Sequence, residues 1–292
     1  MTRYGTILQN YWDWRAAGNF IFGGTGSGLM IMAVMLAYPG PINMALGLPS
    51  LAFMALGLFL VWLEIGRPMR FLHVFYHPQT SWMTREGTVA SVLFPVALLG
   101  MTFNSPWLVA IAGLLAAMFL YCQARILQAS KGVPAWRDPA IVRLVVSTGL
   151  VEGTAIGLLV LSLMAQAPMW LLTVFGALLA LRAYGWDRYK KSLQRHAAPK
   201  QTLAVIDGIN AMSFWGGNIV PLGLTFTAVL LPGVSNLLVS IAAVLALAGG
   251  WYTKYTIVRR ASQLQGYAFG KLRKGRPNIK PPVRRKPDRF VF

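Results

Sequence analysis

Long apolar runs alternate with short polar connections along the whole chain. A helix needs about 20 apolar residues to cross the roughly 30 Å hydrocarbon core of a bilayer. The pattern predicts eight membrane-spanning helices, at residues 18–38, 46–65, 88–103, 107–127, 144–165, 169–181, 209–231 and 236–257. The third and sixth are short and need flanking residues at the membrane interface to complete the crossing. We therefore expect an all-α, polytopic membrane protein with an eight-transmembrane-helix bundle over 18–260, preceded by a segment 1–17 and followed by a tail 261–292.

The connections fall into two classes by charge. Four short ones, at 39–41, 104–106, 166–168 and 232–233, contain no lysine or arginine. All 27 lysines and arginines lie toward the other ends of the helices or in the two terminal segments, and twelve of them fall from Lys254 onward. Because lysine and arginine are retained on the cytoplasmic side of a membrane, both termini and the basic connections are predicted to be cytoplasmic.

Composition supports a membrane protein and excludes several other classes. The chain is 56% hydrophobic and only 12% charged, whereas soluble domains carry about 25% charged residues. A single cysteine, Cys122, excludes a disulfide framework and an iron–sulfur cluster held by four thiolates of this chain. The net charge of +19 indicates anionic lipid or an acidic partner rather than nucleic acid. Segment 1–17 lacks the short apolar region of a cleavable signal.

Four glycines, Gly23, Gly24, Gly26 and Gly28, lie within the first apolar run. Inside a membrane span, small residues allow two helix backbones to approach closely. A phosphate-binding loop would instead lie at a junction between a strand and a helix. We therefore interpret these glycines as a packing surface.

The three histidines argue against a haem within this chain. A membrane cytochrome b binds haem iron through axial histidines that lie inside its helices. His73, His77 and His196 all fall in predicted cytoplasmic connections. The sequence therefore predicts a subunit without a transmembrane haem.

Charged residues gather between the second and third predicted helices. Glu64 ends the second helix, and Glu86 opens the third, where we expect Thr84 to cap the helix. Three arginines are near enough in sequence to neutralise these acids: Arg67, Arg70 and Arg85. Such residues either form ion pairs that anchor helix ends at the interface or belong to a functional site.

Glu152, in the sequence GLVEGT, is the one acid that lies well inside a predicted span. An ionisable group within the membrane is by default a candidate for function. One alternative function is a secondary transporter in which Glu152 is the coupling acid. The structural interpretations are a buried partner for a lysine or arginine of a neighbouring helix, or a neutral acid that is hydrogen-bonded.

Several segments together resemble one family. The runs LEIGRPMR and HPQTSWMTRE resemble the signature that joins helices two and three in membrane-anchor subunits of dimethyl sulfoxide reductase and its relatives, the DmsC/NrfD type. Gly23-Gly24, the stretch ARILQASKGVPAW after the fourth span and AGGWYTKY in the last span also resemble family segments. The likeness covers the whole eight-helix body.

The resemblance implies a haem-free, quinone-reactive anchor in the bacterial inner membrane. In that family a ferredoxin-like iron–sulfur subunit with four clusters docks on the anchor and relays electrons to or from a molybdenum or tungsten bis-pterin catalytic subunit. The quinone is menaquinone or ubiquinone. The family's quinone-linked acid falls on Glu86, and its partner at the end of helix two, often a histidine, falls on Glu64. Gly249-Gly250 and Lys254 stand where some relatives have Gly-Glu followed by arginine.

Quinone chemistry fits the same residues. Reduction of a quinone takes up two protons with two electrons, so the site needs a hydrogen-bond donor and a titratable relay to water. Glu86 and Glu64 are the predicted proton carriers, and Trp82 is expected to hold the ring. The other predicted quinone-site residues are His73, His77, Arg67, Arg70, Arg85 and Lys254. We expect the basic segment 182–200 and the tail after Lys254 to dock the iron–sulfur subunit, with anionic lipid as the alternative contact.

Overall fold

The computed structural model describes residues 6–64, 72, 75–76, 78–103, 105–164, 167–231 and 235–264. Within these residues the protein is a set of long, roughly parallel and antiparallel helices, with one pair of two-residue strands. The predicted all-α class is confirmed.

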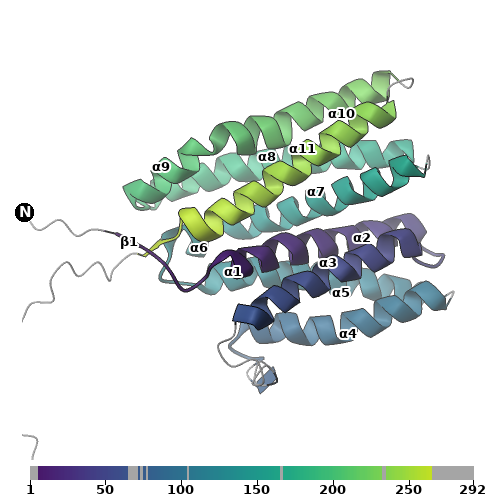
Figure 1. Cartoon of the computed structure of the whole chain (residues 1–292), viewed down its shortest axis with the longest axis horizontal. Helices are drawn as coiled ribbons and strands as arrows, with labels where there is room; N and C mark the ends of the chain where they lie inside the picture. Colours follow the sequence, from purple (N-terminus) through teal and green to yellow (C-terminus); the bar gives the residue numbers. More distant parts are fainter. Residues whose placement is uncertain are drawn as a thin grey trace, which may run out of the picture.

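The long helical segments follow one another along the chain (Figure 1). The first runs from Trp14 to Ala37 as α1 (Trp14–Gly18), the π-helical turn η1 (Asn19–Gly23) and α2 (Gly24–Ala37). Single helices follow: α3 (Met44–Glu64), α4 (Trp82–Thr102), α5 (Pro106–Ala129), the short α6 (Pro134–Arg137), α7 (Ala140–Leu163) and α8 (Met169–Arg195). The last two segments are α9 (Lys200–Gly208), η3 (Ala211–Ile219) and α10 (Val220–Leu230), then α11 (Ser235–Tyr255) and η5 (Thr256–Arg260).

Seven of these segments are long and apolar enough to cross a membrane, which makes the chain a multi-pass membrane protein. They are Trp14–Ala37, Met44–Glu64, Pro106–Ala129, Ala140–Leu163, Met169–Arg195, Lys200–Leu230 and Ser235–Arg260. Helix α4 is not among them, although it has 21 residues. Its first turns contain Thr84, Arg85 and Glu86, which lower its mean hydropathy. The predicted count of eight spans stays a prediction.

Helix α4 begins earlier than the apolar pattern indicates. Ser81 is its N-cap: the backbone is extended there, and Oγ accepts a hydrogen bond from the Thr84 N–H at 3.3 Å. The expectation that Thr84 caps this helix is therefore wrong. Because the helix starts at Trp82, Glu86 lies one turn inside it and its side chain can turn toward the core.

Helix α8 ends much later than predicted. Trp186, Tyr189 and Leu193 repeat at helical spacing beyond residue 181, and all three are buried. Their spacing of three and four residues keeps one apolar face on the core. Beyond Arg182, which is itself buried, the lysines and arginines of this stretch therefore occupy the other faces of a continuing helix rather than a loop.

The long helices form two groups, α2–α5 and α7, α8, α10 and α11, which meet along α2 and α7 (Figure 1). A side chain on Gly153 of α7 would overlap the backbone of Gly28 in α2, and one on Gly28 would overlap the carbonyl of Gly149. The backbones are therefore in direct contact. The predicted role of Gly28 in close helix packing is confirmed.

The two described ends of the chain meet at one end of the bundle (Figure 1). Strand β1 (Ile7–Leu8) pairs antiparallel with β2 (Gln263–Leu264). Just after β1, the Trp12 ring stacks on Trp136 at 4.7 Å between centroids, and the Trp136 indole N–H donates to the carbonyl of Ile257. These contacts hold the segment before α1 in place beside α6 and the end of the last helical segment.

Candidate functional site

Glu86 lies at the inner side of α4 with a side chain that is only 3% exposed. The Asn19 amide, on the first helix, donates to Glu86 Oε1 at 3.5 Å. The Gln123 amide of α5 donates to the Asn19 carbonyl at 3.0 Å and so holds Asn19 in place. Among the described residues, the hydrogen-bond partner of this buried carboxyl group is therefore a neutral amide.

An apolar cleft of about 500 Å³ lies between α3 and α4 and reaches Glu86. Helix α4 packs mainly on α5 and touches α3 only slightly, which leaves this space open. Phe59, Trp62 and Phe75 are exposed apolar side chains on its wall. The other lining residues are Ala55, Leu58, Val61, Met83, Glu86, Gly87, Ala90, Ser91 and Phe94. Glu86 is the one ionisable group among these lining residues.

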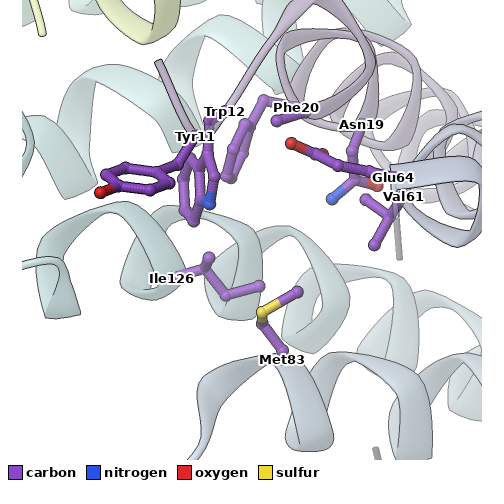
Figure 2. Close-up of a pocket in the computed structure, with 9 residues that line it drawn as sticks. Tyr11, Trp12, Asn19, Phe20, Val61, Glu64, Met83 and Ile126 are labelled. Atoms are coloured by element: carbon purple, nitrogen blue, oxygen red, sulfur yellow. The ribbon is translucent and has the colours of Figure 1, made fainter. Parts of the chain in front are cut away.

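A second cavity of about 270 Å³ lies on the other side of Val61 and Met83, which line both spaces. We call it the Glu64 cavity, since Glu64 is the acid in its wall. Its remaining lining residues are Tyr11, Trp12, Ala16, Asn19, Phe20 and Ile126. Figure 2 shows Glu64 and Asn19 beside each other on one side of the cavity, with Tyr11 and Trp12 on the other.

Charged residues surround the end of α3 near the Glu64 cavity. Asp13 is the N-cap of α1, and its carboxylate lies 2.8 Å from the Arg15 guanidinium. The hydrogen bond from the Arg15 side chain lowers the pKa of Asp13. Arg15 also donates to the carbonyl of Leu63 at 2.7 Å, next to Glu64. These contacts tie the start of α1 to the end of α3.

Arg85 and Trp82 form a separate cluster at the start of α4. The Arg85 guanidinium donates to the carbonyls of Pro78 and Gln79 at 2.7 and 2.8 Å, so it fastens the preceding turn to the helix. It lies 4.2 Å from the Trp82 ring centroid, and Arg125 lies 4.7 Å from the same ring. Neither Trp82 nor Arg85 lines the cleft or the Glu64 cavity.

Four predicted site residues lie outside the described part of the chain: Arg67, Arg70, His73 and His77. The third histidine of the chain, His196, was not a predicted site residue. It lies at the C-terminal end of α8, where Nδ1 is 2.8 Å from a buried carboxylate oxygen of Asp138.

Lys254 is placed away from the cleft, within α11. Its ammonium group lies 2.6 Å from Glu152 Oε2, and both side chains are buried at 3% and 0% exposure. Thr25 also donates to Glu152 Oε2 at 2.9 Å. The interpretation of Glu152 as the buried partner of a lysine therefore describes its environment. Lys254, which was predicted as a quinone-site residue, does not line the cleft.

Arg182 of α8 extends this buried polar cluster within the second helix group. Its guanidinium donates to Asn218 Oδ1 at 2.7 Å, to the Ala246 carbonyl at 3.0 Å and to the Gly217 carbonyl. Only 3% of the residue is exposed. Arg182 was predicted to begin a basic docking surface, and this is wrong because α8 continues past it and its donors are used inside the bundle.

The comparison with protein families decides the relationship. The model of the NrfD_2 polysulfide reductase family matches residues 1–269, which is most of the chain. The chain belongs to this family. A search of curated proteins gives no match.

Membership of the polysulfide reductase family indicates a membrane subunit of a redox complex. Members of the family generally partner with iron–sulfur and molybdoenzyme subunits. The predicted resemblance to DmsC/NrfD-type membrane subunits is therefore confirmed.

The sequence analysis did not predict that three residues take part in these buried polar contacts: Asn19, Gln123 and Arg182. Asn19 and Gln123 lie inside apolar runs, where a lone amide is the available signal, because an unpaired amide in hydrocarbon is costly. Arg182 carries a similar signal, since it directly follows an apolar run and precedes residues that keep a helical apolar spacing.

Proposed function

We propose that the chain is the quinone-reactive, haem-free membrane anchor of a molybdenum or tungsten oxidoreductase complex. It exchanges electrons between the quinone pool and a ferredoxin-like iron–sulfur subunit with four clusters, through which the catalytic subunit is reached. The observation that carries this proposal is the buried Glu86 carboxyl group at the wall of an apolar cleft.

The cleft suits an apolar ligand with a small polar head. Its volume of about 500 Å³ falls in the usual range of small-molecule sites, roughly 300–1,000 Å³. The exposed Phe59, Trp62 and Phe75 extend its apolar wall toward the outside of the bundle. A quinone ring and the first units of an isoprenoid tail, of the menaquinone or ubiquinone type, would be held there by contacts with α3 and α4.

A bound quinone supplies two-electron chemistry that is coupled to two protons. The chain's part is to bind the ring and to hold a proton at the Glu86 carboxyl group. The Asn19 amide, itself held by Gln123, donates to that group, and Glu86 also lines the cleft, where a quinone oxygen would meet it. Glu64 is the second carboxyl group close enough to handle protons, since its cavity shares walls with the cleft.

We also propose that α4 is an eighth crossing and that both termini are cytoplasmic, in a bacterial inner membrane. The pairing of β1 with β2 supports the count, because chain ends that meet on one side require an even number of crossings. The positive-inside rule supports the side. The iron–sulfur subunit would then dock on the cytoplasmic face.

The first prediction tests the role of Glu86 directly. Glu86→Gln keeps the size of the side chain and an oxygen that accepts from Asn19, but it removes the proton carrier, so quinone-linked turnover of the complex should fall about 100-fold or more. Binding of a fluorescent quinone-site inhibitor, measured by quenching, should remain detectable, with or without a change in its affinity. The subunits should stay assembled.

Asp187→Asn is the matched control, because it removes an exposed carboxylate that pairs with Lys191. It should leave turnover and inhibitor binding unchanged. Normal turnover of the assembled Glu86→Gln complex, or no inhibitor binding by the unaltered complex, would contradict the proposed quinone site.

The transporter alternative makes Glu152 the coupling acid. It expects Glu152→Gln to abolish uptake of a solute by vesicles that contain this chain alone. The redox proposal expects no such uptake by the unaltered chain. Its pairing with Lys254 and Thr25 gives Glu152 a structural task in either case.

A further inference from the structure

We infer that the Glu64 cavity is a water-accessible inlet that delivers protons to Glu86, separate from the apolar cleft, and that Asn19 is the residue that connects the two. The inference rests on the proposed role of Glu86. It assigns different entrances to the two reactants of one site: the ring enters between α3 and α4, and protons enter between α3 and the start of α1.

The two spaces are close neighbours with different linings. Val61 and Met83 line both spaces. Apart from the Ser91 hydroxyl and the single carboxyl group of Glu86, the side chains of the cleft are apolar. The Glu64 cavity instead brings together a carboxyl group, the Asn19 amide and the Tyr11 phenol. Water is therefore better accommodated on the Glu64 side.

Two buried acceptors at the Glu64 cavity support water there. Asn19 Oδ1 and Glu64 Oε1 are shielded from the surface and have no hydrogen-bond partner among the described residues. Buried polar atoms are nearly always hydrogen-bonded, and ordered water is the usual partner where protein groups do not supply one. The cavity of about 270 Å³ is large enough for several water molecules.

Asn19 hydrogen-bonds Glu86 and also lines the Glu64 cavity. Its amide N–H donates to Glu86 Oε1, and its free Oδ1 belongs to a side chain that lines the Glu64 cavity. Its backbone carbonyl accepts from Gln123, and Asn19 begins the π-helical turn η1. Such turns occur often at functional sites, because they change the direction of side chains within a helix.

The mouth of the inlet lies at the end of the bundle where the chain ends meet. Tyr11 is 84% exposed there, and the Asp13–Arg15 pair lies beside the end of α3. Figure 2 shows Tyr11 and Trp12 on the side of the cavity away from Glu64 and Asn19. Water at this mouth would continue inward past Glu64 to the Asn19 amide.

The route transfers protons only. A proton from bulk water passes along hydrogen-bonded water and the Glu64 carboxylate to the Glu86 carboxylate, which has released its own proton to the ring oxygen. Only O–H bonds break and form. The electrons for quinone reduction come from the reduced iron–sulfur partner, and for quinol oxidation the proton route runs in reverse.

Cysteine labelling tests the inlet without any measurement of activity. In a Cys122→Ala background, Ala16→Cys places a thiol in the wall of the Glu64 cavity, and Ala17→Cys places one at the neighbouring position, which is fully buried and lines neither space. Ala55→Cys places one in the cleft. Each assembled complex is treated with a small charged methanethiosulfonate or with a lipophilic maleimide.

We expect the charged reagent to modify the residue-16 thiol at least ten times faster than the residue-17 thiol. The residue-55 thiol should react preferentially with the lipophilic maleimide. If the residue-16 thiol is as unreactive as that at residue 17, or reacts only with the lipophilic reagent, the cavity is not an aqueous inlet and the inference fails.

Kinetics test the connecting role of Asn19. Asn19→Leu has similar volume but cannot bind water or Glu86, so kcat should fall about ten-fold or more with an increased solvent isotope effect, while KM for quinone stays within two-fold. Asn19→Ser leaves space for a water molecule and should recover most of kcat. A raised KM with an unchanged isotope effect would mean that Asn19 acts only in quinone binding.

The two proposals can fail separately. If Glu86→Gln is inactive but the residue-16 thiol resists charged reagents, the quinone site stands and the inlet does not. If Glu86→Gln is fully active, the proposed function fails whatever the labelling shows.

Discussion

The Glu152–Lys254 ion pair is the centre of a buried polar cluster where the two helix groups meet. Glu152 comes from α7 and Lys254 from α11, and Thr25 of α2 adds a hydrogen bond to the same carboxylate oxygen. The indole N–H of Trp251 in turn donates to Thr25 at 3.0 Å. Removing one charge of such a pair is costly because the other stays buried without compensation.

This arrangement gives a prediction for stability. Glu152→Leu and Lys254→Met, each alone, should destabilise the subunit by about 3–5 kcal/mol. The double variant should lose much less than the sum, since neither charge is then left unpaired. The measurement is a double-mutant cycle on the midpoint of denaturant-induced unfolding of the detergent-purified complex.

The exposed Asp187–Lys191 pair of α8 is the matched control for this cycle. Removing either of its members should give no measurable change, because solvent screens exposed pairs. Additive losses for Glu152 and Lys254 would show that the two side chains do not depend on each other, contrary to the geometry.

At the scale of single residues, the sequence identified the charges of the site better than their partners. Glu86, Glu64 and Glu152 stand out because acids are rare in apolar helices. The partners come from residues far away in sequence: Asn19 is 67 positions from Glu86, and Lys254 is 102 positions from Glu152. Such pairings depend on helix packing, which a pattern along one chain does not contain.

At the scale of helices, direct backbone contact between α2 and α7 makes one glycine far more sensitive than its neighbour. A side chain on Gly153 would overlap the backbone of Gly28, whereas one on Gly157 would make ordinary contacts of 3.6 Å or more. Both glycines lie on α7, one helical turn apart. Helix propensity alone would favour alanine equally at both positions.

Gly153→Ala should therefore lower the thermal stability of the purified subunit strongly, because the two helices must separate to accept the methyl group. Gly157→Ala should leave it unchanged or slightly higher. Thermal unfolding followed by circular dichroism compares the two variants, and an equal effect at both positions would contradict the backbone contact.

Helix ends show where a hydropathy pattern stops being informative. The number and order of long helical segments follow from the apolar runs, yet α4 begins six residues before its predicted start and α8 continues to Arg195. In both cases polar residues belong to the helix. Ser81 caps α4. The buried Trp186 and Tyr189 keep α8 packed on the core. Neither the cap nor this packing depends on mean hydropathy.

At the scale of the whole molecule, the meeting of the chain ends constrains the topology. Strands β1 and β2 join the segments before the first helix and after the last one, which supports our proposal that both segments lie on one side of the membrane. Within the described part of the chain, seven helices qualify as spans by length and hydropathy. An odd number of crossings would separate the two segments, and in the proposed topology α4 is the eighth crossing.

Three exposed positions in the Cys122→Ala background test this topology together. Lys191→Cys lies at the basic end of α8, Asn43→Cys lies just before α3, and Thr102→Cys lies at the end of α4. If α4 crosses the membrane and the basic end is cytoplasmic, a membrane-impermeant maleimide added to intact cells should label residues 43 and 102 but not residue 191. Lysed cells should allow labelling at all three.

The pattern of labelling separates two errors. Labelling of residue 191 alone in intact cells would keep eight crossings but reverse the orientation, and the iron–sulfur subunit would then have to dock on the opposite side. Labelling of residue 43 without residue 102 would mean that α4 does not cross. The cleft between α3 and α4 would then lie outside the bilayer core, and a lipid-soluble quinone would lose its direct entrance to Glu86.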